Sequence, residues 1–254
     1  MKKFFYSFAL LVLSLMSCES NSDDDTNPPE NSTNDTILPT QVEIVYSDGE
    51  TETIQYTYDG KKLIKEESTD GYFKDFIYED NRLIEINYYE GADFEILESF
   101  TYDSQERVAT ITTNIVGTGV YEDSQTYNED GTVITQSSLT FPNSASSTIT
   151  ITDGNIINFT EADVYTTTSV YDDKNGVFKN VELREQLVTI FSENNDAFSF
   201  TLNNISSESI VENSTTESED YTYTMTYTSF DYPRTVEEDG EGEITTYTYT
   251  YNND

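Results

Sequence analysis

Apolar and polar residues alternate with a period of two along most of this chain. The alternation begins near Gln41 and is clearest toward the C-terminus, where tyrosine and threonine alternate from Tyr221 to Tyr227 and again from Tyr247 to Tyr251. Successive side chains of a β-strand point to opposite faces, so the pattern predicts strands with one apolar face and one face in water. Residues 41–254 are therefore expected to form one domain of all-β, antiparallel structure.

Short turn signals separate the alternating runs. Pairs of Asp-Gly or Asn-Gly lie at Asp48-Gly49, Asp59-Gly60, Asp70-Gly71, Asp130-Gly131, Asp153-Gly154, Asn175-Gly176 and Asp239-Gly240, with Glu90-Gly91 in a similar place. Asn and Asp tolerate a positive φ and Gly adopts it freely, as tight hairpin turns require. We expect each pair to join two neighbouring strands.

The hairpins share a sequence repeat. An aromatic-x-Tyr run is followed by a turn, a basic residue and an aliphatic residue, and the clear copies are residues 56–63, 76–83 and 100–108. Weaker copies occupy residues 127–133 and 171–177. One hairpin cannot bury its apolar face alone, so the units must stack edge to edge. The sequence predicts an antiparallel meander of about ten to fourteen strands, forming a large twisted sheet that rolls into a half-barrel or folds over as a sandwich. Acidic side chains would blunt its long edges.

One segment, residues 179–192, departs from the strand pattern. Val181, Leu183, Leu187 and Phe191 lie near helical spacing, whereas the β-branched run 188–190 favours a strand. A short helix and a strand are both left open. A helix here would plug one end or face of the sheet.

The N-terminus carries targeting information. Lys2 and Lys3 precede an uncharged run over residues 4–16, which has the length of a signal-peptide core and is too short to span a bilayer comfortably. The run ends in Leu-Met-Ser-Cys at residues 15–18, which resembles a bacterial lipobox, and Cys18 is the only cysteine of the chain. The resemblance implies a lipoprotein signal peptide over residues 1–17 and acyl chains on Cys18 that hold the protein to the outer membrane.

Residues 18–40 have the composition of an acidic disordered tether, with no basic residue. Ser22, Asp23, Asp24 and Asp25 resemble the acidic export signal of Bacteroidetes surface lipoproteins, and the alternative is an ordinary solvated linker. Residues 35–37, Asp-Thr-Ile, resemble an O-glycosylation pattern of that phylum. These resemblances imply a lipid-anchored protein of the outer membrane that is exposed at the cell surface.

The repeats resemble the YD repeats of Rhs-type bacterial proteins in degenerate form. The whole layout is similar to secreted Bacteroidetes lipoproteins of unknown function, including a Tyr-Asp-Asp-Lys-Asn motif at residues 171–175 and a Tyr/Thr-rich hairpin over residues 221–251. These motifs are structural and supply no catalytic residues. The chain has too few units to wrap a shell around a toxin, as long Rhs proteins do.

Charge and composition exclude several classes of function. The chain has 12 basic and 49 acidic residues, and this net charge of −37 repels nucleic acid and anionic lipid. Membrane attachment must then come from acyl chains. The chain has no histidine, which removes Ser-His-Asp triads and His-based zinc sites, and no phosphate-binding glycine loop occurs.

Two acidic motifs carry weaker hypotheses. Asp172 and Asp173, next to Lys174, are the candidate carboxylate pair of a glycoside hydrolase, although the motif is more simply a turn. Residues 128–131 and 237–241 are incomplete calcium loops that allow at most weak Ca²⁺ binding, and no other cofactor is expected.

The C-terminal tyrosines leave two interpretations. If exposed, they could bind a glycan or a peptide, but their parity matches that of the apolar positions elsewhere and favours the buried face. These residues are Tyr221, Tyr223, Tyr227, Tyr247, Tyr249 and Tyr251. The sequence favours a non-enzymatic surface module that binds a glycan or protein or organises the envelope. The alternatives are a polysaccharide-acting enzyme and a ligand-free spacer.

Overall fold

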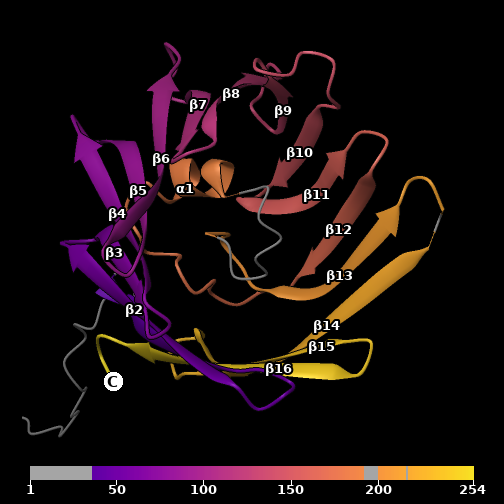
Figure 1. Ribbon diagram of the computed structural model, residues 1–254. Coiled ribbons are helices and arrows are strands. Elements are labelled where there is room, and N and C mark those ends of the chain that lie inside the picture. The colour runs from indigo at the N-terminus through magenta and orange to yellow at the C-terminus, as the bar shows by residue number, and fades with distance from the viewer. Residues whose placement is uncertain (1–35, 192–199, 216) are drawn as a thin grey trace, which may run out of the picture. The chain divides into compact units, whose positions relative to one another are not determined.

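Sixteen antiparallel strands close into a β-barrel (Figure 1). The computed structural model describes residues 36–191, 200–215 and 217–254, which belong to one compact unit, Asn34–Asp254. The strands are β1 (Pro39–Val45), β2 (Thr51–Asp59), β3 (Lys62–Ser68), β4 (Tyr72–Glu79), β5 (Arg82–Glu90), β6 (Asp93–Tyr102), β7 (Val108–Ile115), β8 (Gly119–Tyr127), β9 (Val133–Ser138), β10 (Ser147–Thr152), β11 (Asn155–Glu161), β12 (Tyr165–Tyr171), β13 (Ile205–Glu212), β14 (Ser218–Tyr227), β15 (Pro233–Gly240) and β16 (Glu243–Tyr251). One short helix, α1 (Arg184–Ile190), lies within the ring of strands.

The expected antiparallel meander is confirmed, but the half-barrel and the sandwich are wrong. Strand β1 pairs with both β2 and β16, with Val42 opposite Ile54 on one side and opposite Tyr249 on the other. Closure leaves no sheet edge, so acidic side chains have no edge to protect. The ordered chain also begins earlier than Gln41, since Ile37 and Leu38 are buried in the core.

Most of the turn signals form the expected hairpins. Gly49, Gly60, Gly71, Gly91, Gly131 and Gly154 all have positive φ between paired strands. Two glycines serve close packing instead. A side chain at Gly176 would collide with the carbonyl oxygen of Thr201, and one at Gly240 would lie 2.5 Å from the ring of Tyr221. These two pairs were wrongly predicted as hairpin turns, and β15 turns into β16 at Glu241-Gly242.

The sequence repeat becomes a chain of hydrogen bonds between hairpins. In each case a tyrosine near the end of one strand donates its hydroxyl proton to a backbone carbonyl near the start of the preceding strand, over 2.5–2.9 Å. The pairs are Tyr78 to Leu63, Tyr102 to Leu83, Tyr127 to Val108, Tyr171 to Ile156 and Tyr251 to Pro233. Within the described residues, the buried hydroxyl of Tyr58 has no such partner.

The basic residue of the repeat covers the tyrosine of the next unit. Lys62 lies 5.7 Å from the ring centre of Tyr78, Arg82 lies 5.6 Å from that of Tyr102, and Arg107 lies 4.2 Å from that of Tyr127. A cation over an aromatic face is stabilising by about 0.5–1 kcal/mol at exposed sites. Each repeat therefore contacts the tyrosine of the next repeat twice, through a backbone carbonyl that accepts from its hydroxyl and through a basic side chain that covers its ring.

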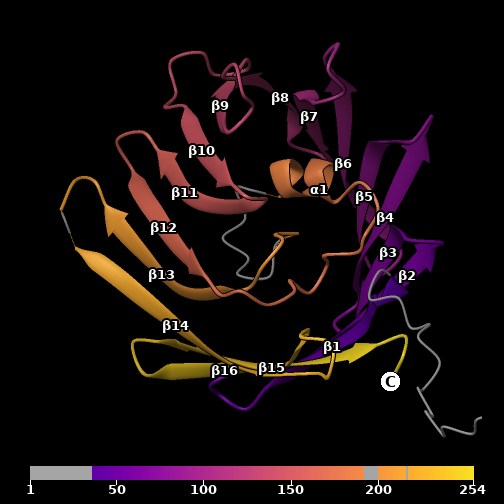
Figure 2. The same cartoon turned by 180° about the vertical axis from the view of Figure 1, so that it is seen from behind.

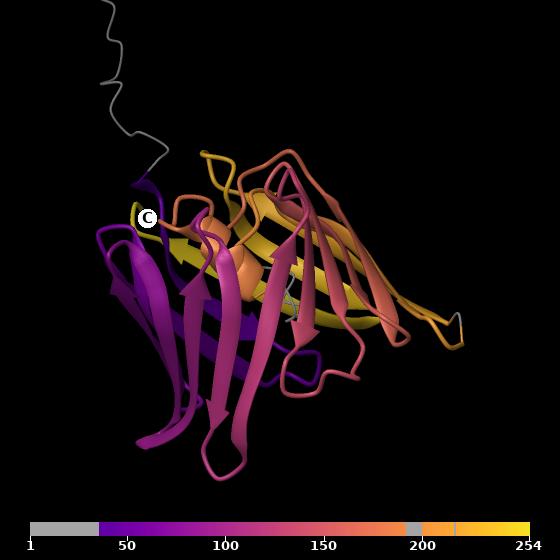
Figure 3. The same ribbon diagram turned by 90° about the horizontal axis from the view of Figure 1, so that it is seen from above.

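One end of the barrel is filled by the plug, which we define as residues 172–191 and 200–204. Of the two alternatives left open for residues 179–192, the helix is the one that forms, as α1, and Figures 2 and 3 show it inside the ring of strands near one rim. Aromatic rings of the plug pack in series on the wall formed by β2 to β4, with centroids 4.6–6.3 Å apart: Phe76, Phe191, Phe200, Phe178 and Tyr56. The plug and the inward side chains of the strands form one buried cluster.

The outer face of the barrel is largely polar. One outward row runs through Thr226, Thr235, Thr248, Glu43 and Thr53 on five strands. A second row joins Thr101, Thr110, Ser124 and Ser137. The inward neighbours of these residues include core side chains such as Val42 and Val236. Outward aromatic residues gather locally, where Phe73 and Tyr89 stack at 4.3 Å and Phe94 contacts Tyr89.

We predict that Tyr102→Phe lowers the free energy of unfolding by about 1–2 kcal/mol, because it leaves the carbonyl of Leu83 without its hydroxyl donor. Urea denaturation would measure the change. Tyr121→Phe is the matched control, since the Tyr121 hydroxyl makes no hydrogen bond within the described residues. Equal stabilities of the two variants would contradict a structural role for the link between hairpins.

Candidate functional site

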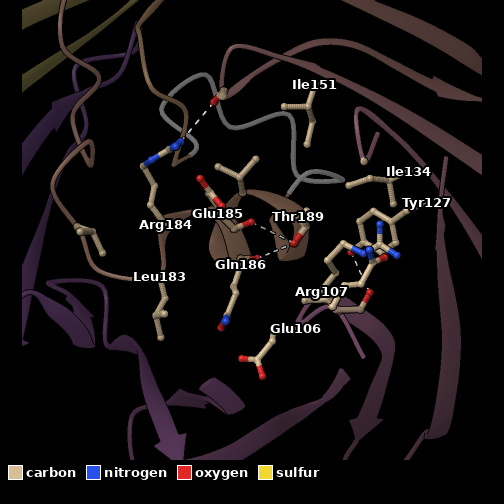
Figure 4. Close-up of a pocket in the computed structure, with 16 residues that line it drawn as sticks. Glu106, Arg107, Tyr127, Ile134, Ile151, Leu183, Arg184, Glu185, Gln186 and Thr189 are labelled. Atoms are coloured by element: carbon tan, nitrogen blue, oxygen red, sulfur yellow. Dashed lines mark hydrogen bonds between the residues drawn. The ribbon is translucent and has the colours of Figure 1, made fainter. Parts of the chain in front are cut away.

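A pocket of about 720 Å³ opens between the plug and the barrel rim (Figure 4). The turns β6–β7, β8–β9 and β10–β11 form one side, and residues of α1 form the other. Its apolar lining includes Ile134, Ile151, Val181 and Val188. The volume lies within the range of small-molecule sites, which are mostly apolar with a few placed polar groups.

Arg107 is one polar group of this pocket. Its side chain donates to the Asp103 carboxylate at 2.8 Å through Nε, with Nη2 at 2.7 Å, while the guanidinium lies over the Tyr127 ring. The Asp103 carboxylate also accepts backbone N–H groups of Gln105 and Arg107. These contacts hold the pKa of Asp103 below its usual value despite the opposing effect of desolvation. Arg107 is therefore rigidly placed by the repeat.

Arg184 is the second basic group, at the start of α1. Its Nη1 donates to the carbonyl oxygens of Gly154, at 3.3 Å, and Phe200, at 2.8 Å. Among the residues that the structure describes, Arg184 is the one arginine without an ion pair, since Arg82, Arg107 and Arg234 each meet a carboxylate. Burial lowers the pKa of Arg184. The side chain is thus a half-buried cation that makes no ion pair within the described residues, although the exposed Glu185 beside it acts on it electrostatically.

Polar groups on α1 complete the lining. The Gln186 side-chain oxygen accepts from the Leu83 backbone N–H and the Tyr102 hydroxyl, which ties the helix to the repeat. The Glu185 side chain is exposed at the pocket. Leu183, directly before the helix, has a φ of 61° and no side-chain cap. Such a conformation costs about 1–3 kcal/mol and persists only where the surrounding structure enforces it.

The predicted carboxylate pair does not form a site. Both Asp172 oxygens accept hydrogen bonds, from the backbone N–H groups of Lys174 and Asn204, the Asn204 amide and the Tyr227 hydroxyl. The Asp173 side chain is 91% exposed and pairs loosely with Lys174 at 3.7 Å. The motif is therefore a fastening between the plug and β14, and a catalytic role for it has no geometric support.

The residues of the two incomplete calcium loops have structural roles in a turn and in a strand. Asp130 accepts the backbone N–H and the hydroxyl of Thr132, while Glu237 and Asp239 belong to strand β15. Nowhere in residues 36–191, 200–215 and 217–254 do three or more metal-binding side chains converge.

The C-terminal tyrosines face the barrel interior, as their parity predicted. Tyr223 is 9% exposed, and Tyr249 and Tyr251 are each 2% exposed. Tyr221, Tyr227 and Tyr247 pack against the same core. They are wall and core residues, so an exposed binding surface made of these six tyrosines was the wrong alternative.

The predicted lipidation and export residues lie outside the described residues. These are Cys18, Ser22, Asp23, Asp24 and Asp25. Of the predicted glycosylation pattern, Thr36 is exposed and Ile37 is buried.

Sequence reasoning missed the residues that line the pocket. Arg107 had a signal, as the basic position of a repeat, whereas Arg184 and Gln186 had none beyond their place in the helical segment.

Acidic side chains also face the interior. The Glu208 side chain is 8% exposed and accepts a hydrogen bond of 2.8 Å from Ser169. Burial raises the pKa of Glu208, opposed by Ser169 and reinforced by Glu238. Burial likewise raises the pKa of Glu98, which accepts from Tyr88 at 2.7 Å.

The fold has counterparts among solved structures. A porin-like protein from Bacteroides uniformis matches with a TM-score of 0.50 at 13% identity, over 84% of this chain and 98% of that one. A porin-like protein from Bacteroides vulgatus matches with a TM-score of 0.51 at 12% identity, over 85% and 98%. At these identities the likeness concerns the fold alone. No family model and no curated protein matches the chain. Across the described part of the chain, no helix is long and apolar enough to cross a bilayer.

We predict that Asp172→Ala lowers the free energy of unfolding by about 2–4 kcal/mol, because four donors lose their acceptor. The adjacent Asp173→Ala is the control and should change stability by less than about 0.5 kcal/mol. Chemical denaturation of both variants decides the matter. If Asp173→Ala were the more damaging change, the fastening role of Asp172 would be refuted.

Glu208→Gln should stabilise the protein at pH 8. A carboxyl whose pKa is raised on folding contributes stability at low pH that is lost as the pH rises through the folded pKa. Glutamine removes that loss, so its advantage should shrink toward pH 4, near the ordinary carboxyl pKa. Thermal melts at several pH values provide the measurement, with the exposed Glu237→Gln as control. A gain at pH 8 that persists undiminished at pH 4 would contradict the assigned cause.

Proposed function

We propose that the protein is a lipid-anchored, non-enzymatic binding module of the bacterial cell surface, with its barrel in water outside the bilayer. The observation that carries the proposal is the distribution of side chains, with polar rows outside and a packed aromatic core inside. Membrane-spanning barrels have the reverse arrangement, with an apolar belt outside and a polar interior.

The outward rows argue against insertion of the barrel into lipid. Thr, Ser and Glu occupy paired outward positions around much of the wall, including Glu43 and Glu237. Placing a polar or charged group in the hydrocarbon region without a partner costs several kcal/mol. The outward aromatic cluster at Phe73, Tyr89 and Phe94 is confined to the neighbouring strands β4, β5 and β6.

The plug argues against a channel. Barrels of sixteen to eighteen strands leave an aqueous lumen when nothing fills them. Here Phe178, Phe191 and Phe200 lie buried inside the barrel and pack on Phe76 and Tyr56 of the wall. A solute would have to displace this buried cluster.

The place where the chain enters the barrel fits a tether. Leu38 exchanges hydrogen bonds with Asn252, so the start of β1 and the C-terminal residues lie together at the plugged end. Residues 19–35 would reach at most about 60 Å when fully extended. Acyl chains on Cys18 could therefore hold the domain clear of the bilayer. Binding is favoured over catalysis because the predicted carboxylate pair is structural, while the pocket beside α1 combines apolar side chains with Arg107, Arg184 and polar groups that include Glu106 and Glu185.

We predict that the full-length protein fractionates with membranes, whereas Cys18→Ser leaves it in the soluble fraction without detergent. The reason is that the acyl chains would be its only attachment to lipid. Cell fractionation followed by immunoblotting measures this, with Ser20→Ala as the control that keeps the anchor. A Cys18→Ser protein that resists extraction from membranes would show that the barrel itself is inserted.

The same strain series tests exposure at the cell surface. Replacing Asp23, Asp24 and Asp25 together with alanine should keep the protein in the membrane fraction but protect it from protease added to intact cells. Unchanged digestion would refute the export role of the acidic cluster.

A further inference from the structure

We infer that the pocket between α1 and the β6–β11 rim binds a small ligand bearing one carboxylate, of the hexuronate sugar class, with the carboxylate held by Arg184. The inference rests on the proposed binding function and names its ligand. Four observations carry it: an arginine without an ion pair, apolar surface in the lining, free amide groups at the rim, and an exposed acid that limits the ligand's charge.

Arg184 supplies the anchoring charge. Within the described residues, the hydrogen bonds of Arg184 all come from Nη1, which donates to the Gly154 and Phe200 carbonyls, and Arg184 makes no ion pair there. Nε and Nη2 make no hydrogen bond to those residues, which leaves two donors in a planar fork, the geometry that matches a carboxylate. Figure 4 shows Arg184 and Arg107 on opposite sides of α1. Arg107 already pairs with the Asp103 carboxylate, so it contributes positive charge and surface to the pocket and does not offer two free donors.

The remaining lining fits the body of a sugar. Ile151 is half-buried and offers apolar surface for the C–H face of a pyranose ring, beside Ile134 and Val188, which are buried. The Gln186 oxygen is engaged by Leu83 and Tyr102, but its NH₂ group makes no hydrogen bond within the described residues. The Gln105 side chain is exposed at the rim. The side-chain NH₂ groups of Gln186 and Gln105 provide donors for ring hydroxyls, and the side-chain oxygen of Gln105 provides an acceptor.

The acids near the pocket select for a single negative charge. Glu106 is neutralised by Arg82 at 2.6 Å, but Glu185 is exposed at the pocket and acts on Arg184 electrostatically. Together with the net charge of −37, this repulsion disfavours a dianion such as a phosphate ester. A monoanionic sugar meets one free guanidinium and tolerates the surrounding field.

Titration calorimetry with the acylated full-length protein in detergent tests the inference, using methyl glucuronide and methyl glucoside as probes. We expect the glucuronide to bind one site per chain and the glucoside to bind at least about tenfold more weakly, since the lost contact is a charge-assisted hydrogen bond. Arg184→Gln should weaken glucuronide binding by at least about tenfold and leave glucoside binding unchanged.

A second variant, at an exposed position, tests the inference even if Arg184→Gln fails to fold. Glu185→Gln removes a repelling charge from an exposed position and should tighten glucuronide binding about two- to fivefold, an effect that added salt reduces. Glu217→Gln removes the same charge in the exposed β13–β14 turn, away from the pocket, and should have no effect. Equal binding of the two glycosides would overturn the inference while leaving a binding module. Absence of glucuronide binding, or no gain for Glu185→Gln, would also overturn it, whereas the proposed surface location is decided separately by the Cys18→Ser fractionation.

Discussion

The width of the barrel is the constraint on which the rest of the structure depends. Sixteen strands enclose more space than the inward side chains can fill, so the chain must supply a filler. The plug provides it, with Phe178, Phe191 and Phe200 packed against one another and on Tyr56 of β2 and Phe76 of β4. The tyrosines of the repeats line the same rim and fix each hairpin to the previous one. The pocket exists because the plug fills this end only partly, leaving a space beside α1.

The barrel fold alone does not decide whether its wall meets lipid or water, and the distribution of polar side chains does. Two porin-like proteins share the architecture at 12–13% identity. In this chain the alternation places threonine outside and tyrosine or aliphatic residues inside, as along β14 and β16. One backbone topology can serve in lipid or in water, and the parity of the apolar residues decides which solvent the wall meets.

Much of the wall was predictable from the sequence because it depends on local rules. The parity of Tyr223 and Tyr249 indicated the buried face, and Asp59-Gly60 or Asp130-Gly131 indicated the hairpins. Closure was not predictable, because pairing of β1 with β16 joins segments about two hundred residues apart and no local signal marks it. The same limit hid the pocket, because Arg107 and Arg184 come to line one cavity only after the plug folds back. Gly176 resembled a turn residue but is required by the close approach of Thr201.

The central claim is that this barrel is folded and closed in water. Hydrogen–deuterium exchange of the chain beginning at Glu19, in buffer without detergent, tests it most directly. The account predicts slow exchange for strand amides around the whole wall, including Val42 of β1 and Tyr249 of β16, where the barrel closes. Rapid exchange in buffer with protection only in detergent micelles would contradict it.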